Sequence, residues 1–250
     1  MHGQPLRNTA FLPPPIEAGV SCLSVDEISG INRQLYRIQR LAGNMIALDK
    51  LNRNDYIKAF CFMDFNAWVK KPMEEAQDLC ASMNRTFRYK LCSEYTHIRG
   101  DRELLERMFY NLLSNAIKFG DPNEVVSCWT DRSATHLFFH MQNICLDTEK
   151  EFLRNAFTRF AANDVLPDPR FGLGMGLPLV QAIARLHGGM AAAEVRDKTA
   201  TVTIAIPLSH NNGKIPLNQV PKVEYSGGIH RSILELSDVL PNQTFHPDAL

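Results

Sequence analysis

The chain has 250 residues, of which 45% are hydrophobic and 22% charged, as in an ordinary globular protein with a buried core. The charges of its 27 basic and 27 acidic residues cancel. This argues against a general nucleic-acid or membrane-surface ligand, because both are anionic and bind proteins with an excess of basic residues. No apolar run approaches the roughly 20 residues of a membrane helix, and the six cysteines form no CxxC pair. We therefore expect a cytoplasmic protein with reduced thiols.

The first part of the chain, residues 1–55, is expected to hold one long amphipathic helix over about 25–51. Ser24 and Glu27 have the spacing of a capping box at its start. Apolar residues then recur every three or four positions, at Ile28, Ile31, Leu35, Ile38, Ala42 and Met45. Such a stripe needs a partner surface, which a second chain or the protein's own flank would supply.

Residues 56–208 mix short strands and helices without regular βαβ periodicity, which predicts an α+β sandwich with helices on one face of a sheet. The expected strands cover residues 59–65, 86–92, 125–131, 136–143, 190–197 and 199–208. The expected helices cover residues 67–83 with Pro72 in the first turn, 101–120 with Asp101 as cap, 150–160 and 177–189.

Residues 209–250 begin with a polar, turn-rich stretch and are expected to form a linker and a C-terminal tail. Residues 229–240 predict one short helix in that tail. It would either dock onto a partner or pack on its own domain.

A glycine-rich segment is the first candidate for a binding site. Gly172, Gly174 and Gly176 alternate with larger residues, and Pro178 is suited to the first turn of a helix that follows. Glycines let backbone N–H groups approach an anion, and a helix N-terminus offers free N–H groups to a phosphate. Taken alone, the pattern is weak evidence for phosphate binding, because many such runs are only flexible loops.

The second candidate lies on the helix expected over residues 101–120. Asn111, Asn115 and Lys118 are spaced by four and three residues, so they share one face of that helix. Two amide oxygens and an ammonium group could hold hydrated Mg²⁺ and its phosphates, since Mg²⁺ prefers oxygen ligands and keeps several waters. Solvated surface polar residues are the alternative.

Together the two motifs resemble those of the sensor histidine kinases. Residues 100–120 look like the N box of that family, 170–189 like its G2 box, and 150–160 like its F box with Phe157 and Phe160 at the aromatic positions. The resemblance spans about residues 59–208. It implies the Bergerat fold, a two-layer α/β sandwich with a mixed sheet covered by helices, preceded here by the long amphipathic helix.

By this resemblance the cofactors are ATP and Mg²⁺. Asn111 would hold the metal, Asn115 and Lys118 would contact the phosphates, and Gly172, Gly174 and Gly176 would shape the end of the lid over the nucleotide. The gyrase and chaperone branch of the fold carries a glutamate base at the place of Asn111, and its absence argues against fast ATP hydrolysis. No catalytic residue is assigned.

The chain departs from the family at the G1 box, where Asn143, Cys145 and Asp147 replace an aspartate and two glycines. Asn143 could still accept a hydrogen bond from the adenine amino group, but without the charge. Cys145 adds a Cβ beside the base, and Asp147 adds bulk and a negative charge near an anionic ligand. We expect weakened or absent ATP binding.

The phosphoacceptor is the second departure, because only His2 precedes the first helix and it lacks an adjacent acidic residue. His187 matches a family position with a structural role. We expect a histidine-kinase-like signalling protein that forms a homodimer through its N-terminal helix and meets a response regulator or another kinase. A pseudokinase acting as a protein-interaction module and a serine kinase of the anti-sigma-factor type are the alternatives.

Overall fold

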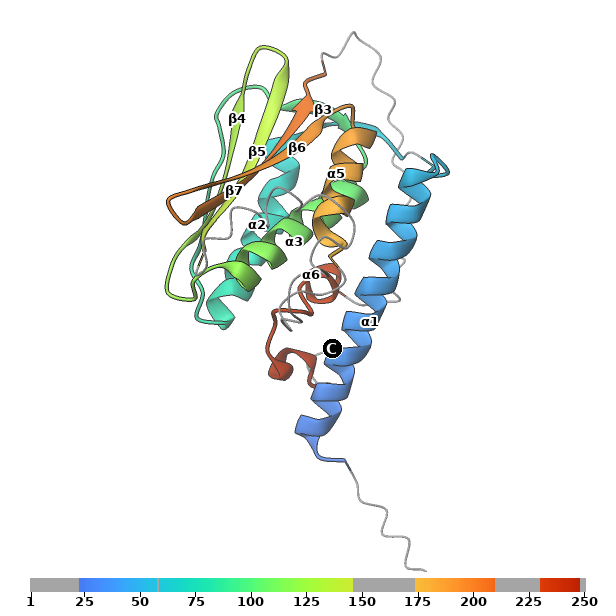
Figure 1. Cartoon of the computed structure of the whole chain (residues 1–250), viewed down its shortest axis with the longest axis vertical. Helices are drawn as coiled ribbons and strands as arrows, with labels where there is room; N and C mark the ends of the chain where they lie inside the picture. Colours follow the sequence, from blue (N-terminus) through green and yellow to red (C-terminus); the bar gives the residue numbers. More distant parts are fainter. Residues whose placement is uncertain (1–22, 58, 146–173, 210–229, 248–250) are drawn as a thin grey trace, which may run out of the picture.

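The computed structural model describes residues 23–57, 59–145, 174–209 and 230–247. Figure 1 shows a sheet on one side, a layer of helices against it, and one long helix along the far side of that layer. The chain is therefore an α+β protein in which helices cover one face of a mixed sheet, as expected.

The main sheet has five strands in the order β2-β4-β5-β7-β6. These strands are β2 (Phe87–Lys90), β4 (Val126–Arg132), β5 (His136–Ile144), β6 (Met190–Arg196) and β7 (Thr199–Pro207). β2 is parallel to β4, and all other neighbours are antiparallel. Alternate residues of β5 are buried, which is the pattern of a sheet with one covered face.

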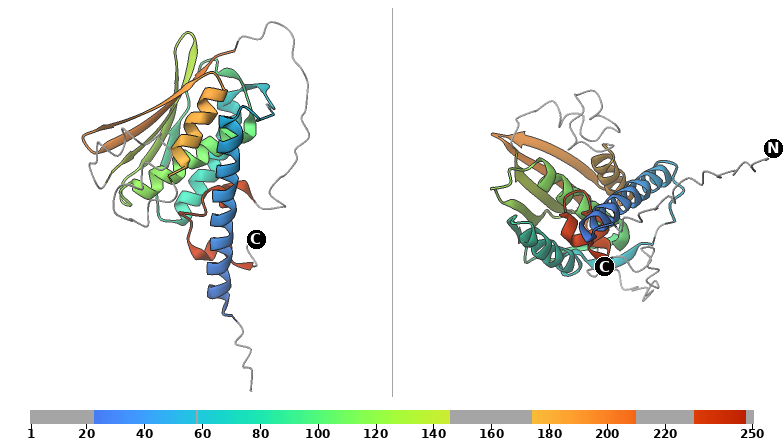
Figure 2. Two further views of the ribbon diagram at one scale, coloured as in Figure 1. Left: turned by 45° about the vertical axis from the view of Figure 1, so that its right-hand side comes forward. Right: turned by 90° about the horizontal axis from the view of Figure 1, so that it is seen from below.

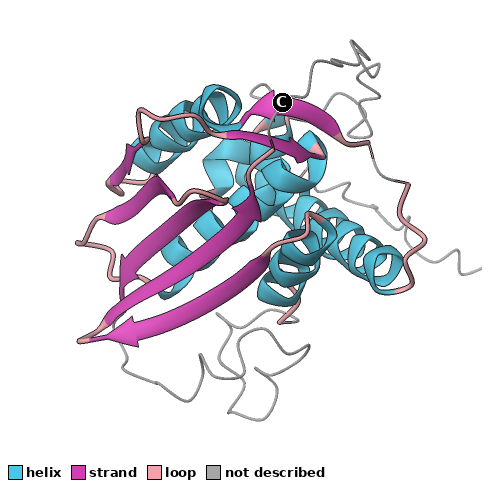
Figure 3. Cartoon of the chain, turned by 90° about the horizontal axis from the view of Figure 1, so that it is seen from above, coloured by secondary structure: helices cyan, strands magenta, loops and turns pink. Residues whose placement is uncertain are grey.

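Three helices cover that face, as Figure 3 shows from above: α2 (Phe65–Ser82), α3 (Arg102–Phe119) and α5 (Gly176–Leu186). Phe109 of α3 and Phe65 of α2 both meet Phe139 of β5 edge-on, with ring centroids 6.2 and 5.8 Å apart. Asp101 caps α3 by accepting hydrogen bonds from the N–H groups of Glu103 and Leu104. The core thus fixes the position and start of α3, the helix that carries both candidate asparagines.

The long helix α1 (Val25–Asn52) has the expected capping box between Ser24 and Glu27. It lies beside α5, on the side of the helix layer away from the sheet. Its buried face is partly polar and includes Arg40 and Asn44. Its apolar stripe points the other way, into solvent. No helix in the described ranges has the length and hydropathy needed to cross a membrane.

Residues 230–247, here called the C-terminal segment, pack on the same protein rather than extending away from it. They comprise α6 (Arg231–Glu235), a turn through Leu240 and the 3-10 helix η2 (Asn242–Phe245). Leu236, Leu240 and Phe245 are fully buried, and Phe245 meets Tyr36 of α1 with ring centroids 5.2 Å apart. Figure 2, seen from below, shows this segment between α1 and the helix layer.

The structure corrects several expectations from the sequence. Pro72 is not in the first turn, because the Asp64 side chain caps α2 and starts it at Phe65, so the proline lies well inside the helix. A short strand, β3 (His97–Gly100), pairs antiparallel with β1 (Cys61–Asp64), although no strand was expected there. The helix expected over 229–240 is limited to α6. The helix expected over 150–160 lies outside the described residues.

Candidate functional site

The amide face of α3, formed by Asn111, Asn115 and Lys118, is the first component of the candidate site. The helix runs from its Asp101 cap to Gly120, so all three residues lie in its regular part. Asn111 is buried, whereas Asn115 and Lys118 are half-buried. The face points away from the sheet, toward α1 and the C-terminal segment.

The start of α5 is the second component. Gly174 has a φ of +61°, a left-handed conformation that favours glycine, and Met175 supplies no side-chain cap to the helix. A Cβ added at Gly176 would lie 3.3 Å from Asn111 Oδ1 and 3.4 Å from Asn115 Nδ2. The fold therefore brings the glycine motif and the amide face of α3 together. Gly172 lies outside the described residues.

The third component is Asn143 near the end of β5, which is buried and pairs with Ala200 of β7. Its amide nitrogen lies 3.5 Å from Cys145 Sγ, and its Cβ lies 3.3 Å from the place of a Cβ added at Gly120. Asn143, the residue expected to contact adenine, therefore lies beside Gly120 at the end of α3. Gly120 follows Lys118 by two residues. Asp147 lies outside the described residues.

In this structure the side chain of Asn111 is engaged by the protein itself. Its Oδ1 accepts hydrogen bonds from Asn44 Nδ2 at 3.2 Å and from Arg40 Nη2 at 3.4 Å. Its Nδ2 donates to the backbone oxygen of Arg107 at 2.8 Å, and only 1% of the residue is exposed. A metal ion bound by Asn111 would therefore have to replace these two donors.

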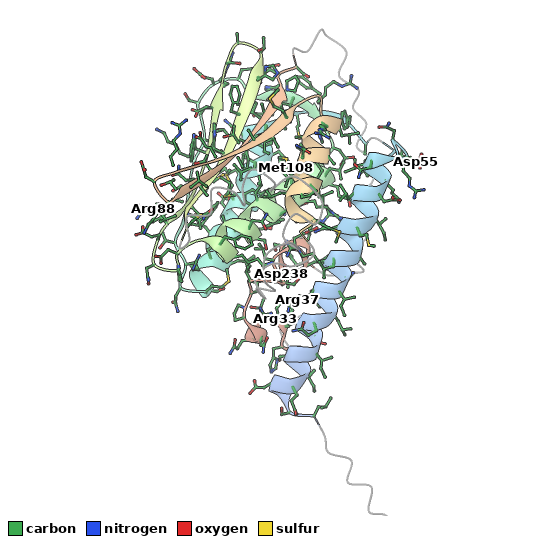
Figure 4. The ribbon with its side chains drawn as sticks, viewed as in Figure 1. Arg33, Arg37, Asp55, Arg88, Met108 and Asp238 are labelled. Carbon is green, nitrogen blue, oxygen red and sulfur yellow. The ribbon has the colours of Figure 1, made fainter. Side chains whose placement is uncertain are left out.

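Lys118 is engaged by Asp238 of the C-terminal segment. The Asp238 carboxylate lies 3.1 Å from Lys118 Nζ, 2.7 Å from Arg40 Nη1 and 3.1 Å from Arg37 Nε. Figure 4 shows Arg37 and Asp238 facing each other where α1 meets this segment. Burial raises the pKa of Asp238, but Arg40 and Lys118 outweigh it and bring the pKa to about 2. Asp238 therefore stays ionised at neutral pH.

Glu235 is a second carboxylate of the C-terminal segment, and unlike the half-buried Asp238 it is fully buried. Its oxygens lie 3.6 Å from Arg40 Nε and 3.4 Å from Arg107 Nε, and its side chain is 2% exposed. Sequence reasoning missed Arg40, Asn44, Glu235 and Asp238. The sequence pattern that could have identified Arg40 and Asn44 is their spacing of one helical turn on the polar face of α1, opposite the apolar stripe.

The donors present fit the phosphate end of a nucleotide. The uncapped start of α5, the Lys118 ammonium and the Arg40 guanidinium are groups that bind phosphate oxygens. The described residues contain no cluster of three or more His, Cys, Asp or Glu side chains that could hold a metal. A magnesium ion here would thus take most of its ligands from phosphate and water.

His187 has the structural role expected from the sequence. Its Nε2 accepts a hydrogen bond from the backbone N–H of Asp101 at 3.0 Å, and its Nδ1 lies 2.7 Å from the carbonyl of Ile183. The histidine thereby links the end of α5 to the cap of α3, which holds the two helices of the candidate site in register.

Replacing Asp238 by Asn is predicted to lower the free energy of unfolding in a pH-dependent way. The carboxylate stabilises the fold fully above its ordinary pKa of 3.8, and this contribution is lost as the pH falls toward 2. At about pH 6 the loss should be about 2 kcal/mol, and it should shrink below about pH 4. Urea denaturation measures it, with Asp49→Asn on exposed α1 surface as the control. A difference that does not change with pH would contradict the ion-pair account.

Comparison with known proteins agrees with this geometry. Residues 100–210 match the family model described as histidine kinase-, DNA gyrase B- and HSP90-like ATPase. Sensor histidine kinase HprS of Escherichia coli (strain K12) is 27% identical over 180 residues, which are 72% of this chain and 39% of that protein. The chain spans from about a tenth to about two fifths of the length of the curated relatives it matches.

Solved structures show the same fold. Histidine kinase AdeS of Acinetobacter baumannii superposes with a TM-score of 0.62 at 17% identity, covering 77% of this chain and 89% of that one. Histidine kinase ThkA, solved in complex with response regulator protein TrrA, gives a TM-score of 0.56 at 18% identity, covering 72% of this chain and 51% of that one. Sequence and fold together therefore support a histidine-kinase-type ATPase domain in this chain.

Proposed function

We propose that this chain is a histidine-kinase-like signalling protein that binds Mg²⁺-ATP weakly. The observation that carries the proposal is the meeting of Gly176 with Asn111 and Asn115 at the uncapped start of α5. Asn115 and Lys118 would contact the phosphates, Asn111 would hold the metal, and Gly174 and Gly176 would shape the loop beside them. Bound ATP would supply a transferable phosphoryl group at this end of the site.

Binding of ATP is expected to be weak because the site recognises the adenine base poorly. Asn143 stands where the family has an aspartate, and it offers adenine a neutral acceptor instead of a charged one. Hydrogen bonds to charged groups contribute about 1.5–3 kcal/mol and neutral ones about 0.5–1.5, so the change costs about 1 kcal/mol. The Cys145 side chain adds bulk beside it, in a position where the family keeps the backbone bare.

Calorimetric titration with Mg²⁺-ATP tests the proposal directly. The triple variant Asn143→Asp, Cys145→Gly and Asp147→Gly should bind about fivefold or more tightly than the natural chain, because the charged acceptor and the bare backbone return. Asn143→Ala is the control and should bind less tightly than the natural chain. Sub-micromolar binding by the natural chain would contradict weak base recognition, and no binding by any variant would contradict nucleotide binding.

A catalytically inactive pseudokinase is the second candidate. It is favoured by the occupied state of the site, since Asn111 and Lys118 are both engaged by side chains of the protein itself. Incubation with γ-labelled ATP and a candidate partner separates the candidates. Acid-labile label on the partner would support phosphoryl transfer to histidine, acid-stable label a serine kinase, and no label the interaction module.

We also propose that α1 forms a homodimer through its apolar stripe. Ile31, Leu35 and Ile38 are 48%, 57% and 62% exposed, and Ala42 and Met45 continue the same face. The spacing alternates between three and four residues, as in the seam of a coiled coil. The opposite face of α1 already packs on the protein's own helices, so the stripe is free to meet a second copy. A response regulator or another kinase is the proposed partner of the dimer.

Replacing Leu35 by Glu is predicted to convert the dimer to a monomer, because two carboxylates would then face each other across an apolar seam. Sedimentation equilibrium measures the change. Lys50→Glu adds negative charge at an exposed position of α1 outside the stripe and should leave the dimer intact. A natural chain that is monomeric at high micromolar concentration would contradict this mode of assembly.

A further inference from the structure

The C-terminal segment covers the amide face of α3. It lies in the angle between α1 and the helix layer, and it contacts α1 through both α6 and η2 and α3 through α6. Leu236, Leu240 and Phe245 anchor it by complete burial. The segment follows the family-matched region in sequence, yet it returns to the side of the domain that carries Asn111 and Lys118.

Two carboxylates of the segment, the half-buried Asp238 and the buried Glu235, meet the cations of the candidate site. Asp238 is bound by Lys118, the residue expected to contact phosphate, and by Arg40 and Arg37 of α1. Glu235 lies between Arg40 and Arg107. Without these acidic groups, the buried Arg40 and the half-buried Lys118 would lie close together with no counter-charge, an arrangement that favours binding of an anion.

The backbone of the segment is held as well. Arg33 of α1 donates from Nε to the carbonyl of Ser237 at 3.2 Å and from Nη2 to the carbonyl of Asp238 at 3.1 Å. It also donates from Nη1 to Asn242 Oδ1 at 3.2 Å. Arg33 thus holds the segment through three hydrogen bonds, none of which involves the Asp238 carboxylate, and it precedes Arg40 by about two helical turns. Figure 4 shows Arg33 and Asp238 on the side where α1 meets the segment.

We propose that the C-terminal segment is a displaceable strap, and that the Asp238 carboxylate and a phosphate group of the nucleotide compete for Lys118 and Arg40. This inference rests on the proposed binding of Mg²⁺-ATP at the same face. The strap makes the nucleotide site available only in the fraction of molecules in which the segment has moved away.

The competition follows from the chemistry of the contact. Carboxylate and phosphate oxygens accept the same charge-assisted hydrogen bonds from lysine and arginine, so one anion excludes the other. Two buried polar atoms of α1 at this contact, Asn44 Oδ1 and Arg40 Nε, have no hydrogen-bond partner among the described residues. A phosphate with its water shell offers these atoms partners that the strap does not.

Binding of inorganic triphosphate and of Mg²⁺-ATP to the full-length chain tests the strap. Asp238→Asn should increase the affinity for both by about tenfold, because the covered state loses its main ion pairs and the open fraction rises. Arg33→Gln loosens the strap without touching the Asp238 carboxylate and should increase both affinities by about threefold. Asp49→Asn removes one negative charge elsewhere on α1 and is the matched control. Thermal unfolding verifies that each variant is folded.

The Arg33→Gln variant distinguishes release of the strap from a simple effect of charge on anion binding. Loss of a cation near an anion site should weaken anion binding, whereas release of a strap should strengthen it. Tighter triphosphate binding by folded Arg33→Gln, with no gain in Asp49→Asn, supports the strap. Affinities of Arg33→Gln equal to or below that of the natural chain, or an equal gain in the Asp49 control, overturn it, whatever the gain in Asp238→Asn.

Triphosphate and ATP also distinguish this inference from the proposed function. Triphosphate lacks adenine, so a gain in its binding with no ATP binding in any variant would retain the strap and overturn the nucleotide function. Binding of ATP that is unchanged in the strap variants would retain the function and overturn the strap. No binding of triphosphate to any variant would overturn the strap, because its release should expose an anion site.

Discussion

The ion pair of Asp238 with Lys118 and Arg40 joins three parts of the chain that are far apart in sequence. Removing water from a charge costs several kcal/mol, so a buried carboxylate persists only where cations surround it. The same contact therefore places the C-terminal segment, neutralises the polar face of α1 and occupies the lysine of the candidate site. The arrangement of α1, α3 and the segment depends on it.

This constraint also explains the orientation of α1. A helix with an apolar stripe normally turns that stripe toward its own core, but here the buried side includes Arg40 and Asn44. Arg40 and Asn44 are buried because Asp238, Glu235 and Asn111 supply their partners. The apolar stripe is then left on the outside, where a second copy of the helix would cover it. The proposed coverage of the nucleotide site and the proposed assembly through α1 thus share one cause.

The sequence predicted the elements whose cause is local. Asp101 and Gly120 bound α3, the glycines precede α5, and the expected strands overlap all five strands of the main sheet. It predicted the meeting of α3 and α5 only through resemblance to a family, since no spacing rule brings Asn111 near Gly176. The pairing of Asp238 with Lys118 could not be predicted from the sequence, because the two residues are 120 positions apart. The composition of the segment that carries Asp238 indicated only a tail. Pro72 was misplaced because the cap at Asp64 was overlooked.

The most direct test of the central claim is hydrogen–deuterium exchange of the natural full-length chain, with and without saturating inorganic triphosphate. The amides of residues 232–240 should be protected in the free chain and exchange faster when triphosphate is bound, while those of α3 stay protected. The change reports displacement of the segment by an anion without any substitution. Unchanged or increased protection of residues 232–240 with triphosphate bound would contradict the account.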